Sequence, residues 1–118
     1  MSERSELIRK LVLNLHVNVI ERQILGILHE EEVTEAIRAI LDEQGAFPRR
    51  RYGPSVYEGA VITTDNGQPE VTWERPSPLN PTVVADQRRQ TFANMDAAIR
   101  AYIDSEWPRG IDGIVIHR

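Results

Sequence analysis

The sequence predicts an α+β fold in which an antiparallel sheet of three or four strands packs against two N-terminal helices and one helix before the last strand. Three observations support this prediction: a hairpin signal at Asn66-Gly67, a change of helical phase within residues 29–32, and a capped amphipathic helix that begins near Asn94. Because 118 residues suffice for one hydrophobic core but not for two, we expect a single domain over residues 1–118.

The composition is that of an ordinary globular domain, with 41% hydrophobic and 27% charged residues. The chain has no cysteine, which excludes disulfides and thiolate zinc sites and is compatible with a reducing, cytoplasmic location. No stretch is apolar enough for a membrane span or a signal peptide, so we expect no membrane contact. The net charge of −4 argues against a general nucleic-acid coat, while a local basic site is compatible with it.

Residues 56–75 are predicted to form the hairpin around which the domain is organised. A two-residue type I′ turn needs positive φ at both central positions, and Asn66-Gly67 meets this requirement at low steric cost. Counting outward from this turn gives the register. It places Ile62 opposite Val71, Ala60 opposite Trp73 and Glu58 opposite Arg75. An isolated hairpin is only marginally stable, so we expect helices to cover its apolar face.

Residues 5–29 contain no proline and fit either one helix or, in part, a strand. Apolar and polar residues alternate over residues 11–19, which is typical of a half-buried strand. The helical interpretation covers more residues and places apolar side chains on two opposite stripes. The first stripe consists of Leu7, Ile8, Leu11, Val12, Leu15 and Val19, and the second of Leu13, Val17, Ile20, Ile24, Ile27 and Leu28. We favour the helix because about two dozen residues without a turn signal exceed the roughly five or six of a typical strand.

The remaining elements follow from local signals. A second helix is predicted over residues 30–43, and Gly45 suits the left-handed position after its end. Residues 82–92 fit a strand or a loop equally well. Asn94 is the expected N-cap of a third helix, and Ile114-Val115-Ile116 is predicted to be a strand inside the sheet, covered on both faces.

We find no catalytic or metal-binding motif in the sequence. GxSxG, GxxxxGK[ST], GxGxxG and HExxH are all absent. His16, His29 and His117 lie far apart in the sequence, and we interpret them as exposed or strand-end residues. The carboxylates sit mainly where helices face water. We therefore predict no catalytic residue, no metal and no cofactor, and we lean towards a protein that is not an enzyme.

The two-faced N-terminal helix carries the favoured functional prediction. Leaving each of six apolar side chains exposed forfeits about 1.5–3 kcal/mol relative to burial, so we expect a second protein surface to cover them. The predicted partner-binding residues are Ile20, Ile24, Ile27 and Leu28. The favoured function is a small non-catalytic protein-interaction module, an adaptor or inhibitor, that forms a homodimer or docks on one protein partner.

A basic loop provides the second hypothesis. Arg49, Arg50, Arg51 and Tyr52 are candidates for anion or nucleic-acid contact, because arginine forks suit phosphates and tyrosine can stack on bases. The segment VTEAIRAILDEQGAFPRRR, followed by the hairpin, resembles the recognition helix, strand and wing of winged-helix DNA-binding domains. The resemblance covers less than half of the chain. It implies a DNA-binding regulator that uses the basic loop 49–52 and the hairpin 56–75.

Overall fold

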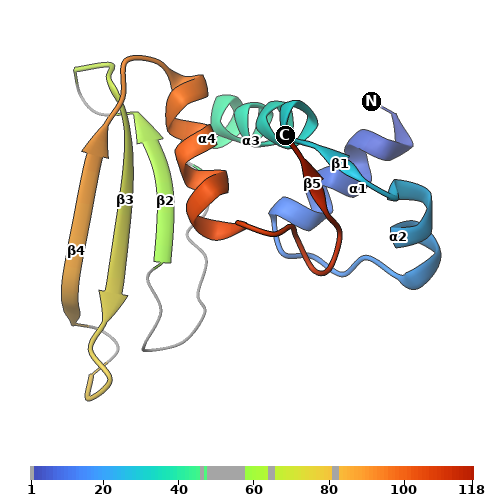
Figure 1. Cartoon of the computed structure of the whole chain (residues 1–118). Coiled ribbons are helices and arrows are strands. Elements are labelled where there is room, and N and C mark those ends of the chain that lie inside the picture. The colour runs from blue at the N-terminus through green and yellow to red at the C-terminus, as the bar shows by residue number, and fades with distance from the viewer. Residues whose placement is uncertain (1, 46, 48–57, 64–65, 81–82) are drawn as a thin grey trace.

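The fold is described from a computed structural model of residues 1–118, and the description covers all residues except 1, 46, 48–57, 64–65 and 81–82. Helices and an antiparallel sheet occur together, as expected for the α+β class (Figure 1). In chain order the elements are α1 (Glu3–Val12), α2 (Val19–Leu25), β1 (Leu28–His29), α3 (Glu30–Gln44), β2 (Glu58–Thr63), β3 (Pro69–Pro76), β4 (Val84–Thr91), α4 (Met95–Glu106) and β5 (Ile116–His117).

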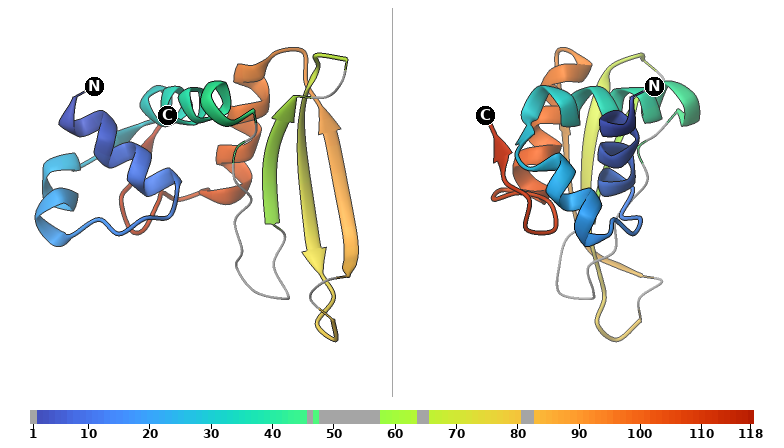
Figure 2. Two further views of the ribbon diagram at one scale, coloured as in Figure 1. Left: turned by 180° about the vertical axis from the view of Figure 1, so that it is seen from behind. Right: turned by 90° about the vertical axis from the view of Figure 1, so that its right-hand side faces the viewer.

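The core lies where α1, α3 and α4 meet. Leu11, Ile37 and Ile99 are fully buried there, one from each helix. Tyr102 of α4 makes edge-on ring contacts with Phe47 and with Trp107, at centroid distances of 5.2 and 5.6 Å. Figures 1 and 2 show α4 between the sheet and the other helices, so that α2 and the sheet occupy opposite ends of the molecule.

The prediction of one helix over residues 5–29 is wrong. α1 ends at Val12, and Asn14 follows with a φ of 60°, a left-handed conformation that asparagine tolerates better than most residues. Asn18 then caps α2: its side chain accepts a bond from the Glu21 amide at 2.8 Å, and the Glu21 carboxylate accepts one from the Asn18 amide. Two asparagines therefore break a segment whose apolar periodicity alone favoured continuity. The alternative strand over residues 11–19 is not observed either.

The hairpin exists, but its predicted register is wrong by one residue. β2 and β3 pair so that Ala60 lies opposite Thr72 and Val61 opposite Val71. The reason lies in the length of the connection, because β2 ends at Thr63 and β3 begins at Pro69. Five residues, 64–68, therefore connect the strands instead of two. Val71 and Trp73 of β3 remain on the face that packs on α4, where the Trp73 indole donates a hydrogen bond to the Ser105 hydroxyl at 2.8 Å.

The final strand lies outside the antiparallel sheet, which contradicts the prediction of an interior position. That sheet has the order β2-β3-β4, while β5 pairs in parallel with β1 in a separate two-stranded ribbon. Asp112 and Gly113 both have positive φ and form a tight turn, in which Ile111 and Ile114 exchange two backbone hydrogen bonds of 2.9 Å. This turn directs β5 towards β1. In the described ranges, none of the helices is long and apolar enough to cross a bilayer.

Candidate functional site

The solvent-facing side of α2 is apolar. Val19 and Ile20 are 70% and 69% exposed, and Ile24, one turn after Ile20, is 51% exposed, whereas Leu25 on the opposite side is buried. At about 100° per residue, the exposed side of this short helix is formed by Val19, Ile20, Gln23 and Ile24. A surface helix normally presents charged or polar residues to water, so α2 departs from the usual pattern.

The β1–β5 ribbon, which follows α2 in the chain, also carries exposed apolar residues. Leu28 and Ile116 lie opposite each other and are buried, so the residues before them face outwards. These residues are Ile27 and Val115, which are 57% and 56% exposed. The amide of Leu28 donates to the carbonyl of Val115 at 2.9 Å, which holds the two chain segments side by side. We call Val19, Ile20, Ile24, Ile27 and Val115 the α2 surface.

Three of the four predicted partner-binding residues lie on this surface, namely Ile20, Ile24 and Ile27. Leu28 is instead a core residue with no exposed area, because the ribbon turns its side chain inwards opposite Ile116. Sequence reasoning missed Val115, whose exposure depends on the parallel pairing of two distant segments. The periodic pattern assigned Val19 to the wrong stripe because it treated α1 and α2 as one helix.

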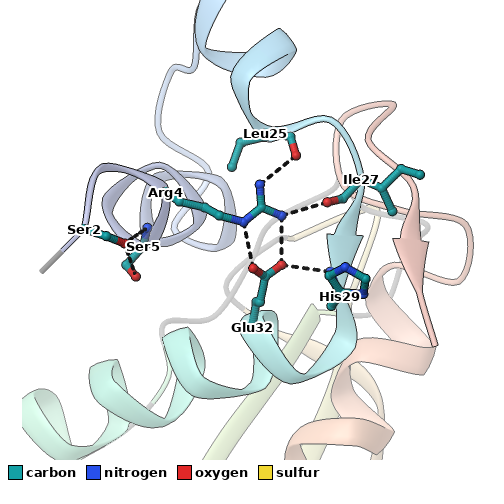
Figure 3. A network of polar contacts seen from close by, with 7 residues as sticks. All are labelled: Ser2, Arg4, Ser5, Leu25, Ile27, His29 and Glu32. Carbon is teal, nitrogen blue, oxygen red and sulfur yellow. Dashed lines mark hydrogen bonds and ion pairs between the residues drawn. The ribbon is translucent and has the colours of Figure 1, made fainter.

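Arg4 holds the α2 surface in place (Figure 3). Its guanidinium forms two parallel bonds to the Glu32 carboxylate, at 2.7 and 2.9 Å. The same group donates to the carbonyls of Leu25 and Ile27, each at 2.8 Å. Leu25 ends α2 and Ile27 precedes β1, so one side chain of α1 fixes the chain on both sides of Gly26 to the first turn of α3. We call these contacts the Arg4 clamp.

The clamp lowers the pKa of Glu32 from its ordinary value of 4.5 to about 2. The main cause is the side-chain hydrogen bond from Arg4, and the backbone amide of His29 adds a bond of 3.0 Å, while partial burial acts in the opposite direction. Since the folded-state pKa lies below the unfolded value, the carboxylate stabilises the fold above about pH 4.5. This contribution is lost as the pH falls towards 2.

Glu32→Gln should therefore destabilise the protein at neutral pH by about 1 kcal/mol, a modest value because the pair is roughly one-third exposed. We expect the difference in the free energy of unfolding between this variant and the wild type to shrink as the pH falls from about 4.5 towards 2. Urea denaturation at a series of pH values would measure it. A difference that stays constant over this range would show that the Glu32 charge contributes nothing to folding.

The structure brings His29 and His117 together, which their sequence separation did not indicate. They occupy opposite positions of the β1–β5 ribbon, with ring centroids 5.6 Å apart and planes at 89°. Nearby, the Glu30 carboxylate pairs with Arg100 and Arg118. Among the described residues no group of three or more His, Cys, Asp or Glu side chains is arranged to hold a metal ion. Two exposed imidazoles by themselves define no site.

A half-open groove of about 360 Å³ runs between α1 and α3. Its lining includes Ser2, Ser5, Ile8, Glu35, Ala36 and Ala39, together with Arg4, Arg9 and Glu32. Arg4 is bound to Glu32, and Arg9 forms two bonds to the Glu43 carboxylate at 3.0 and 2.5 Å. The arginines of the groove are thus engaged in structural ion pairs. Nothing in this lining sets up a nucleophile beside a base.

The predicted anion-contact residues Arg49, Arg50, Arg51 and Tyr52 lie outside the described residues. The proposed recognition helix is α3, and its exposed positions are largely acidic. They include Glu31, Glu35, Asp42 and Glu43. Its one arginine, Arg38, is paired with Asp96. Phosphate groups would be repelled by such a face, so α3 lacks the basic character of a helix that enters a DNA groove.

No protein-family model, curated protein or solved structure matches this chain. Among the residues that the structure describes, the α2 surface departs from the usual polar exterior of a surface helix.

Proposed function

We propose that this chain is a small non-catalytic protein-interaction module, which acts as a homodimer or docks on a protein partner, and that the α2 surface is its docking face. One observation carries the proposal: the outward side of α2 and of the adjoining ribbon is apolar. Every residue of the α2 surface is at least half exposed. Soluble monomers rarely expose contiguous apolar patches above roughly 300–600 Å², and patches of that size are often functional.

The energy available at this surface supports the proposal. Apolar burial contributes about 25 cal/mol per Å², so covering on the order of 400 Å² would contribute about 10 kcal/mol before the cost of association. Association itself costs roughly 4–15 kcal/mol, so a specific complex would also need complementary contacts around this apolar centre. The same area left in water would favour non-specific aggregation.

Charged pairs flank the α2 surface. Lys10 lies 3.6 Å from Glu21, and Arg22 lies 3.9 Å from Asp112, whose carbonyl also accepts a bond from Arg22. An apolar centre with a charged border is the usual anatomy of a protein–protein interface. The capping box of α2 and the Arg4 clamp hold the apolar face in shape, which reduces the ordering cost of binding.

The winged-helix alternative gains no support from the described residues, because the exposed positions of α3 are acidic. The absence of cysteine suits a reducing compartment, and a cytoplasmic location is part of the proposal.

Photo-crosslinking at Gln23 tests the proposal, because this exposed residue lies among the apolar side chains of α2. Gln23→p-benzoylphenylalanine should yield a discrete crosslinked band when cells that make the protein are irradiated. A band of doubled mass made of this chain alone would identify a second copy, and a band that contains another polypeptide would identify a partner.

The matched control places the same photoreactive residue at Asp42, an exposed position on the acidic side of α3. Discrete products at Gln23 with none at Asp42 would support the docking face. Equal, diffuse labelling at both positions would overturn it.

A further inference from the structure

β4 is an exposed edge strand. Among the described residues it has one paired neighbour, β3, and every residue from Val84 to Thr91 is exposed. Figure 1 shows it at the margin of the molecule, with β3 and β2 between it and α4. The strand contains no proline. Proteins usually protect a long edge strand, since its free backbone groups can pair with another chain.

The backbone of β4 determines which residues a further strand could bond. The amide of Phe92 donates to the carbonyl of Pro69 at 2.9 Å, so the backbone groups of Phe92 face β3. Residues alternate along a strand, which directs the backbone groups of Arg88 and Asp86 towards β3 and those of Gln87 outwards. In an antiparallel pair of strands, two opposed residues either both direct their backbone N–H and C=O groups towards the partner strand or both direct them away from it. If β4 pairs with a second copy of itself, each even-numbered residue must therefore lie opposite an even-numbered residue, and each odd-numbered residue opposite an odd-numbered one.

The charges favour one of these registers over the neighbouring ones. If the two-fold axis passes between the Gln87 residues of the two copies, Asp86 of each copy lies opposite Arg88 of the other. The symmetry therefore produces two such pairs. Moving the axis to Asp86, Arg88 or Arg89 would instead place like charges directly opposite each other, which is destabilising. Asp86 and Arg88 would occupy non-hydrogen-bonded positions, where opposed side chains are closest.

Contacts with β3 hold the side chains of Arg88 and Gln87 within each copy, and the register places Asp86 beside them. The Arg88 guanidinium lies over the Trp73 ring, 5.7 Å from its centroid, and Asp86 lies opposite Arg75 in the β3–β4 ladder. On the other face, the Gln87 amide donates to the Glu74 carboxylate at 2.9 Å. A bulge at Ala85 twists the start of β4, so the pairs formed by residues 86–88 would carry the contact.

We propose that two copies of this chain join through β4 in antiparallel fashion, with Gln87 on the two-fold axis, so that their sheets form one continuous sheet. This deepens the homodimer part of the proposed function by assigning the self-contact to β4. It rests on β4 alone and not on the α2 surface. Because α2 lies at the opposite end of each molecule, the dimer would present two α2 surfaces that point away from each other.

Site-specific disulfide formation tests the register, because the chain contains no cysteine of its own. Gln87→Cys should form a covalent dimer under mild oxidation, since opposed bonded residues lie about 5.5 Å apart between Cα atoms, within disulfide range. Thr91→Cys, on the same strand but far from the axis, is the control and should stay monomeric. Equal rates of dimer formation for the two variants would overturn the register.

Light scattering over a concentration series tests the dimer itself, with thermal melting to verify folding. Asp86→Arg should raise the dimer dissociation constant at least 10-fold, and the exchange Asp86→Arg with Arg88→Asp should restore association. Ile24→Glu should leave the mass unchanged. A wild type that is monomeric at all concentrations, or a dimer abolished by Ile24→Glu but not by Asp86→Arg, would overturn the inference; the second result would move the self-contact to the α2 surface.

Discussion

Replacing Gly110 with alanine should release the C-terminal segment from the core and lower the free energy of unfolding by about 3–5 kcal/mol. Gly110 has a φ of 136°, a conformation that residues with a side chain rarely adopt. A Cβ atom there would meet the carbonyl oxygen and carbon of Ile114, which are backbone atoms that cannot move aside without opening the tight turn.

That turn anchors a sizeable part of the core. Ile111, Ile114 and Ile116 are buried, and Ile116 lies opposite Leu28 in the β1–β5 ribbon. If the turn opens, these side chains lose their packing together, and Val115 leaves the α2 surface. The predicted loss therefore includes both backbone strain and core contacts.

Gly45→Ala is the matched control for this prediction. Gly45 ends α3 with a φ of 77°, but nothing lies within 4 Å of the position that a Cβ atom would occupy. Only the cost of a left-handed alanine applies, about 1 kcal/mol. Urea denaturation of both variants separates the two effects. If Gly110→Ala lost no more stability than Gly45→Ala, the close approach of Ile114 would have no energetic significance.

The parts of the fold that the sequence predicted correctly depend on local signals. Residues 30–43 were predicted to be helical, and α3 spans Glu30–Gln44 with Gly45 in the left-handed conformation after it. Asn94 caps α4, and its side chain accepts a bond from the Ala97 amide at 2.9 Å. Caps and C-terminal glycines involve only neighbouring residues, so they can be recognised without knowledge of the tertiary structure.

The errors arose where distant or competing interactions decide the structure. The apolar repeat continues through α1 and α2, so it did not reveal the break that Asn14 and Asn18 impose. The hairpin register was counted from a two-residue turn, whereas five residues, 64–68, connect β2 and β3. The position of β5 depends on the turn after Gly110 and on pairing with β1, neither of which is visible as a local pattern in the run Ile114-Val115-Ile116.

Only part of the α2 surface was predicted, because the rest of it depends on the pairing of distant segments. The apolar stripe that contains Ile20, Ile24 and Ile27 was visible as periodicity. The periodic pattern could not show that Leu28 is buried while these residues are exposed. The burial of Leu28 depends on its pairing with β5, at the other end of the chain.

Leu28→Glu and Ile24→Glu should therefore differ strongly in their effect on stability, although both place a carboxylate in the same predicted apolar stripe. Leu28 is fully buried, and an unpaired charge at that position should cost more than about 4 kcal/mol, a large share of the stability of a small domain. Ile24 is half exposed at the end of α2, and its replacement should change stability by no more than about 1 kcal/mol, part of it from a negative charge near a helix C-terminus.

Thermal melting followed by circular dichroism would measure both effects, and Leu28→Ala, with an expected loss of about 2–5 kcal/mol, provides a milder core variant that should remain folded. A melting temperature for Ile24→Glu as low as that of Leu28→Ala would mean that Ile24 is buried within one chain. If instead Ile24→Glu melts like the wild type, the exposed isoleucines contribute little to folding. Their apolar character would then require another explanation, and contact with a second protein surface is the one that the geometry of α2 favours.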